Sequence, residues 1–194
     1  MTRLRGTPSV LALVALLAGC TSPDADDPGP DAAPTTVAES VLEPCPEQPD
    51  EPTAGGDAVP ALRFDCLGGG TLDLTRAPGV PTVVNLWGSW CPPCREELPL
   101  MQDLADAAGA RVQVLGVISR DGEPQAESFA EDAAITFPSA FDGDGELMSE
   151  LGLNALPYTF FLAADGTLAH TELGPIDSVA ELQTLVAEHL GVQL

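Results

Sequence analysis

Lysine is absent from this 194-residue chain: its seven basic side chains are all arginines, against 30 acidic side chains. The formal net charge is −23 at pH 7. A surface of this charge repels nucleic acid and anionic lipid headgroups, which excludes functions that depend on a basic patch. No internal repeat is visible either, so the sequence does not indicate a repeat architecture.

Histidines and CxxC pairs, which supply the ligands of structural zinc sites, are also scarce. The two histidines, His170 and His189, lie far from the cysteines along the chain, and the only CxxC pair is Cys91 and Cys94. A structural zinc site needs four ligands, usually two such pairs or one pair with closely spaced histidines. We therefore expect no metal and no cofactor; half of a zinc site, or a purely structural bridge, is the alternative explanation of the CxxC.

The apolar run near the start, Val10–Ala18, is too short to span a membrane. It follows two arginines within Met1–Gly19, a pattern typical of a secretory signal peptide. The residues Leu17–Cys20 resemble a bacterial lipobox, which implies cleavage before Cys20 and a diacylglycerol thioether on that cysteine. Two acyl chains suffice for stable anchoring. Ordinary cleavage to a soluble protein is the alternative.

Residues 21–60 are rich in Pro, Asp, Glu, Ala and Gly and contain few large apolar side chains. This composition is typical of a disordered, self-repelling linker. The predicted organisation is a signal peptide at 1–19, a lipid-anchored tether at 20–60 and one domain at 61–194.

The most informative segment that is present is Trp-Cys-Pro-Pro-Cys at Trp90–Cys94. The residues before it, Pro81–Trp87, form a short apolar segment rich in β-branched residues, which predicts a buried strand. After it, Arg95–Ala105 has apolar residues at helical spacing. The cysteine pair therefore lies at a strand-to-helix junction, where unpaired N–H groups and the helix dipole favour a thiolate on Cys91.

Such a thiolate is a nucleophile, and Cys94, one turn into the helix, can resolve the mixed disulfide that it forms. The predicted chemistry is thiol–disulfide exchange. Pro92 and Pro93 lack N–H groups that could have stabilised the thiolate. The disulfide should therefore be comparatively stable, which favours a reductant.

The segment Asn85–Glu97 resembles the active-site segment of thioredoxin-like proteins and is most similar to the membrane-anchored, extracytoplasmic TlpA/ResA type. Pro99 matches the helix-kinking proline of thioredoxins. Ala155–Leu162 resembles the segment with a cis-proline that faces the cysteines, which implies a cis bond before Pro157. The resemblance runs from about Cys66 to the C-terminus.

The resemblance and the order of predicted elements agree on the fold class, a thioredoxin-like three-layer α/β/α sandwich with a mixed central sheet. The predicted strands are 62–66, 71–74, 82–87, 111–119, 137–141, 158–163 and 168–173. The predicted helices are 92–108, 124–134, 146–151 and 178–190.

Further site residues come from the same resemblance. Thioredoxins have a buried aspartate six residues before the first cysteine, whereas this chain has Asn85, which cannot take a proton. Glu97 matches a glutamate that lies near the site in the TlpA/ResA type; desolvated, it could move the proton of Cys94. A solvated surface glutamate is the alternative. Trp90 is expected to flank the site as part of the docking surface, and Trp87 to lie in the core.

Two cysteines remain, Cys45 and Cys66, and export to an oxidising compartment favours a disulfide between them. A structural bridge is the first interpretation, because neither cysteine lies at a helix start. A second redox couple that passes electrons to the Cys91–Cys94 pair is the alternative.

We therefore expect a lipid-anchored thiol-disulfide oxidoreductase on the extracytoplasmic side of the cell membrane, a monomer that reduces protein disulfides. Apocytochrome c as the substrate rests on the resemblance alone. A membrane protein is the expected electron donor, and nucleic acid is not a partner. The alternatives are a thiol peroxidase and a copper-delivery or protein-binding module on the same fold.

Overall fold

Six consecutive buried residues, Thr82–Trp87, form strand β3 at the centre of a five-stranded sheet. A run of buried, mostly apolar residues is what a central strand covered on both faces requires. The structure, a computed structural model, describes residues 40–54 and 59–194, which belong to one compact unit, Ala38–Leu194. No helix in these two ranges is long and apolar enough to cross a membrane.

The sheet order is β5-β4-β3-β6-β7. On one side, β3 pairs in parallel with β4 (Gln113–Ser119), which pairs in parallel with β5 (Ser139–Asp142). On the other side, β3 runs antiparallel to β6 (Tyr158–Leu162), and β6 to β7 (Leu168–Leu173). The predicted mixed sheet of a thioredoxin-like fold is thus confirmed.

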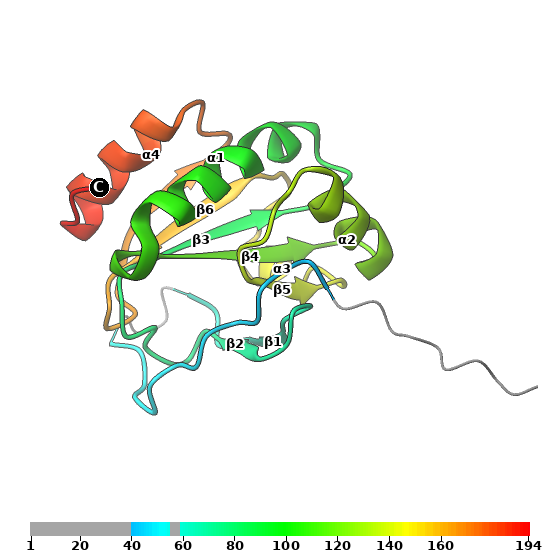
Figure 1. The fold of residues 1–194 in the computed structure, drawn as a ribbon. Coiled ribbons are helices and arrows are strands. Elements are labelled where there is room, and N and C mark those ends of the chain that lie inside the picture. Colours follow the sequence, from blue (N-terminus) through cyan, green and yellow to red (C-terminus); the bar gives the residue numbers. More distant parts are fainter. Residues whose placement is uncertain (1–39, 55–58) are drawn as a thin grey trace, which may run out of the picture. The chain divides into compact units, whose positions relative to one another are not determined.

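The longest helix, α1 (Pro92–Ala108), starts where the chain leaves β3. It packs beside α4 (Val179–Leu185) on the sheet (Figure 1). Its buried face holds Leu98, Met101 and Leu104, as the periodicity predicted. Pro99 lies inside α1 and is exposed, and the helix continues through it.

Shorter helices complete the domain: α2 (Glu123–Asp132), α3 (Glu146–Glu150) and the 3-10 turn η2 (Gly109–Arg111). The predicted terminal helix differs in its last five residues, which form a wider π-helical turn, η3 (Val186–Leu190).

A small antiparallel sheet of β1 (Arg63–Asp65) and β2 (Thr71–Asp73) lies beside the main sheet (Figure 1). An isolated bridge between Cys66 and Ala140 joins it to β5. The short strand pair expected at 62–66 and 71–74 is therefore present, with slightly narrower bounds.

The structure differs from the predicted tether at residues 40–54, which pack against the domain. Leu42 is 2% exposed, and the Glu43 N–H donates to the Thr136 carbonyl. Gln48 accepts from the backbone N–H of Asp73 at 2.8 Å and donates to its carbonyl at 2.9 Å. This segment has no periodic pattern of its own, so its order comes from contacts with residues that are distant in the sequence.

Candidate active site

The turn that carries the first cysteine joins β3 to α1. It spans Gly88–Cys91 and is closed by the Cys91 N–H, which donates to the Gly88 carbonyl at 3.0 Å. Cys91 is the N-cap of α1, with an extended backbone, and Pro92 occupies the first helical position. Proline fits there because that position needs no N–H and the ring fixes a helical φ.

Cys91 and Cys94 form a disulfide, with sulfurs 2.06 Å apart and Cα atoms 5.3 Å apart. The Cys94 N–H donates to Sγ of Cys91 at 3.3 Å. Pro92 and Pro93 cannot add further donors, because neither has an N–H. The first turn of α1 therefore offers one N–H to this sulfur where a proline-free turn would offer more.

Glu97 lies one helical turn after Cys94 and is buried, with 1% of its surface exposed. Its carboxylate accepts from Asn85 Nδ2 at 2.8 Å and from the Ile176 N–H at 2.9 Å. The alternative of a solvated surface glutamate is thereby excluded.

Burial away from water raises the pKa of Glu97 to about 7. The negative charges of Asp177 and Glu172 add to this rise, and the two hydrogen bonds to the carboxylate oppose it. Near neutral pH the side chain therefore exists in both protonation states, as a group that exchanges protons requires.

Asn85, on β3, connects α1 and β6 in this buried region. Its Nδ2 donates both to Glu97 and, at 2.9 Å, to Oγ1 of Thr159 on β6. Its Oδ1, in contrast, has no hydrogen-bond partner among the described residues. The Asn85 side chain thus donates two hydrogen bonds and keeps one open acceptor.

Trp90, the residue directly before Cys91, is 51% exposed, whereas Trp87 is fully buried. The Trp90 indole N–H donates to the Ser119 carbonyl at 3.4 Å. A Cβ on Gly88 would lie 2.6 Å from Nε1 of Trp90, so the close approach of this ring requires glycine there.

The Leu156–Pro157 bond is cis. The next residue, Tyr158, pairs with Leu86 near the end of β3 from which the cysteine turn leaves. The Pro157 carbonyl accepts from the Gly174 N–H at 3.2 Å. The cis-proline therefore lies at the same end of the sheet as the Cys91–Cys94 disulfide.

The second disulfide joins Cys45 to Cys66, with Cα atoms 6.0 Å apart. Neither cysteine lies at the start of a helix: Cys45 is in the extended segment 40–54, and Cys66 follows β1. Cys20, the expected lipidation site, lies outside the described residues.

The two histidines stack on each other, with ring centroids 3.9 Å apart, and both contact Phe161. His170 Nε2 also lies 3.2 Å from a carboxylate oxygen of Glu172. Across residues 40–54 and 59–194, no cluster of three His, Cys, Asp or Glu side chains could hold a metal ion.

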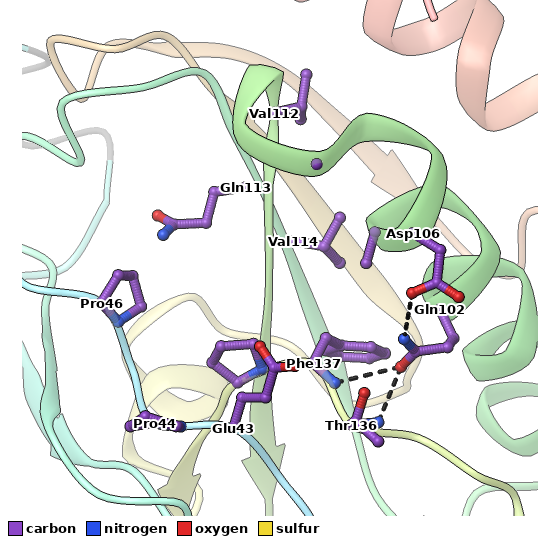
Figure 2. Close-up of a pocket in the computed structure, with 13 residues that line it drawn as sticks. Glu43, Pro44, Pro46, Gln102, Asp106, Val112, Gln113, Val114, Thr136 and Phe137 are labelled. Atoms are coloured by element: carbon purple, nitrogen blue, oxygen red, sulfur yellow. Dashed lines mark hydrogen bonds between the residues drawn. The ribbon is translucent and has the colours of Figure 1, made fainter.

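A pocket of about 340 Å³ lies beside the C-terminal half of α1, away from the cysteines at the start of that helix (Figure 2). One wall is Glu43, Pro44 and Pro46. On the other, Gln102 accepts from the N–H groups of Thr136 and Phe137 (Figure 2). A 17-residue helix is roughly 25 Å long, so this pocket is no part of the cysteine site.

Sequence reasoning named the two cysteines, Trp90, Glu97 and Pro157, and the structure brings all five to one end of the sheet or to the first two turns of α1. It did not find Thr159 or the Ile176 N–H as partners of the buried polar group. No local signal marks these two positions, because they meet Asn85 and Glu97 only through the antiparallel pairing of β6 and the loop before α4.

The chemistry that this geometry supports is exchange between a cysteine thiolate and a disulfide. The class of protein is therefore that of the thioredoxin-like thiol-disulfide oxidoreductases. The sequence profile of the Redoxin family matches residues 54–186, well over half of the chain, and the protein belongs to this family.

Similar proteins carry consistent names. Sporulation thiol-disulfide oxidoreductase A of Bacillus subtilis is 36% identical over 102 residues, which cover 50% of this chain and 62% of that protein. The thiol:disulfide interchange protein DsbE homolog of Paracoccus denitrificans is 34% identical over 136 residues, covering 66% and 73%. The match thus spans somewhat under two thirds of the Bacillus protein's length.

Among solved structures, the crystal structure of StoA from Bacillus subtilis superposes with a TM-score of 0.56 at 32% identity. The match covers 64% of this chain and 96% of that one. The resemblance to TlpA/ResA-type oxidoreductases is confirmed by this structure and by the named relatives.

Proposed function

We propose that this protein reduces disulfide bonds in other proteins through the Cys91–Cys94 pair. The observation that carries the proposal is the position of Cys91 as the N-cap of α1, bonded to a cysteine one turn later. The buried Glu97 beside this turn supplies a proton-exchanging group, and the exposed Trp90 supplies apolar contact area for a substrate.

The reaction starts from the reduced pair. The Cys91 thiolate attacks one sulfur of the substrate disulfide, forming a mixed disulfide and releasing the first substrate thiolate. The Cys94 thiolate then attacks Sγ of Cys91, which re-forms the Cys91–Cys94 disulfide and releases the second substrate thiolate. Two electrons pass to the substrate, and Glu97 takes the proton that Cys94 gives up.

The first turn of α1 supports reduction of substrates as the direction of electron flow. A single N–H, that of Cys94, donates to Sγ of Cys91, because Pro92 and Pro93 have none. Weak stabilisation of the thiolate favours the disulfide form of the protein, and a protein that prefers its own disulfide is a reductant. A dithiol-bearing membrane protein is the proposed electron donor.

The proposed setting is the extracytoplasmic face of the cell membrane, with lipid on Cys20 and the protein acting as a monomer. The support is the signal-like segment 1–19 with its lipobox-like end. Because the acidic surface does not itself bind anionic lipid, attachment to the membrane would come from the acyl chains on Cys20. Apocytochrome c, before haem attachment, is the substrate that resemblance to the TlpA/ResA type suggests.

The test of the function is a reductase assay on a protein disulfide, with the Cys94→Ser variant used to trap partners. Wild-type protein should reduce the disulfide, and Cys94→Ser should accumulate mixed disulfides through Cys91, because the resolving thiol is missing. Identification of the trapped proteins would name the substrate. Absence of reduction by the wild type, together with absence of any trapped species, would refute the proposal.

A further inference from the structure

The Gly88–Cys91 turn is hydrogen-bonded to the residues that follow β4. The chain leaves β4 through Arg120, whose φ of 54° lies in the left-handed region, and the next residue is Asp121. The Asp121 carboxylate accepts from the Ser89 N–H at 2.5 Å and from the Ser89 hydroxyl at 3.1 Å. Ser89 lies inside the Gly88–Cys91 turn.

The other contacts of the turn come from two further directions. The Ser89 carbonyl accepts from Nη1 of Arg95 at 3.5 Å, and the Arg95 guanidinium lies 4.7 Å from the centre of the Phe129 ring on α2. The Trp90 indole N–H donates to the Ser119 carbonyl. Every polar group of Ser89 is thus engaged, and Asp121 takes two of the three.

We propose that Asp121 is a positioning residue for the exchange reaction: through Ser89, its carboxylate fixes the turn that places Cys91 at the start of α1. The inference rests on the proposed function. Attack on a disulfide requires the thiolate to approach along the axis of the S–S bond, so the orientation of Cys91 before the encounter affects the rate.

The chemistry of the carboxylate explains why aspartate is suited to this position. Oδ2 of Asp121 accepts the Ser89 N–H, while Oδ1 accepts both the Ser89 hydroxyl and the Gly122 N–H. An amide has one acceptor oxygen, so asparagine cannot keep this set of bonds. The negative charge is also bonded to the residue two positions before Cys91, and at that position it would oppose a second negative charge on the sulfur.

The test compares Asp121→Asn with Asp132→Asn, which removes the same charge from an exposed position on α2, in the surface hollow that Ser89 also lines. For Asp121→Asn, the rate of protein-disulfide reduction should fall on the order of tenfold, less than the roughly 10²-fold cost of a full 1 Å misplacement. In a Cys94→Ser background, the pH midpoint of Cys91 alkylation by iodoacetamide should move to lower pH. Asp132→Asn should change neither.

Ser89→Ala separates geometry from charge, because it removes one hydrogen bond and keeps the carboxylate. It should slow reduction severalfold and leave the alkylation midpoint unchanged, while its control, Ser128→Ala on α2, should do neither. If Asp121→Asn does not fold, as thermal unfolding would show, the Ser89→Ala result decides the inference. A wild-type rate in Ser89→Ala and in a folded Asp121→Asn would overturn it, as would equal effects of Asp121→Asn and Asp132→Asn.

Failure of the proposed function gives a different pattern, because alkylation of Cys91 needs no protein substrate. If the wild type reduces no protein disulfide and Cys94→Ser traps no partner, the function is refuted whatever the Asp121 and Ser89 variants do. If the wild type is active and Asp121→Asn equals Asp132→Asn in both reduction rate and alkylation midpoint, the role of Asp121 is refuted and the function stands.

Discussion

The two disulfides of this protein differ in their surroundings far more than in their exposure. Cys45 and Cys66 are 8% and 7% exposed, and Cys91 and Cys94 are 3% and 0% exposed. Exposure alone would therefore favour Cys45–Cys66 slightly as the reactive pair. What distinguishes Cys91–Cys94 is the helix start, the backbone N–H that reaches its sulfur and the buried carboxyl group one turn away.

The Cys45–Cys66 bridge has a mechanical position instead. It links the packed segment 40–54 to the end of β1, across 21 positions of sequence. Cys66 also bridges to Ala140 on β5, so the disulfide ties the N-terminal segment to the edge of the main sheet. Local chemistry, rather than burial, is therefore the basis on which we predict that Cys91–Cys94 is the redox-active pair and Cys45–Cys66 the structural one.

The largest expected effect tests directly which of the two cysteine pairs is reactive. Cys91→Ser should abolish disulfide reduction, because it removes the attacking thiolate, whereas the double variant Cys45→Ser/Cys66→Ser should keep its activity at a temperature where it is folded. Reduction of a protein disulfide, followed over time for both variants, checks this. Activity in Cys91→Ser, or its loss in the folded double variant, would assign the chemistry to the other pair.

Glu97→Gln is the next largest expected change. Positioned acid–base groups contribute about 10²–10⁴-fold, and the amide keeps the size and one acceptor of the carboxylate, so the fold should persist while the rate falls within that range. The control is Glu96→Gln, because Glu96 is exposed and turned roughly 100° around α1. Identical rates and pH profiles for the two variants would show that Glu97 does not move protons.

Loss of the Cys45–Cys66 bridge should act on stability. Closing a loop of this length lowers the entropy of the unfolded chain, which is worth roughly 3 kcal/mol. The Cys45→Ser/Cys66→Ser variant should therefore unfold at lower denaturant concentration, as measured with Cys91–Cys94 oxidised in both proteins. An unchanged free energy of unfolding would mean that the bridge does not hold segment 40–54 in place.

The smallest expected effect is the pH dependence that Glu97 gives to stability. Its pKa is raised from 4.5 to about 7 in the folded oxidised protein, so the stability associated with its neutral form is complete below pH 4.5 and is lost as pH rises through 7. Between pH 5 and pH 7 the loss should be about 2 kcal/mol. Denaturant unfolding at several pH values would show this slope in wild type and Glu96→Gln; a similar slope in Glu97→Gln would contradict it.

Much of the site could be predicted because its signals are local. The buried run 82–87, the helical spacing after it and the cysteine pair between them lie within 27 consecutive residues, and β3 and α1 have the predicted bounds. Glu97 and Pro157 followed from a family pattern with fixed spacing. Burial of Glu97 could not be derived, because it depends on packing against the loop that contains Ile176.

The partners that sequence reasoning missed are distant in sequence. Asp121 lies 32 positions from Ser89, and Thr159 lies 74 positions from Asn85. Segment 40–54 was misread for the same reason: its composition is that of a linker, and its order comes from Leu42 and Gln48 meeting later parts of the chain. Contacts made by one or two side chains across such separations leave no periodic pattern.

The most direct test of the central claim is a redox titration of the wild-type protein in buffers of defined dithiol and disulfide ratio. Each pair would be quantified by alkylation and peptide mass. The account predicts that Cys91–Cys94 titrates reversibly as a two-electron couple while Cys45–Cys66 stays oxidised over the same range. Reduction of Cys45–Cys66 together with Cys91–Cys94, or before it, would contradict the assignment of one structural and one redox-active pair.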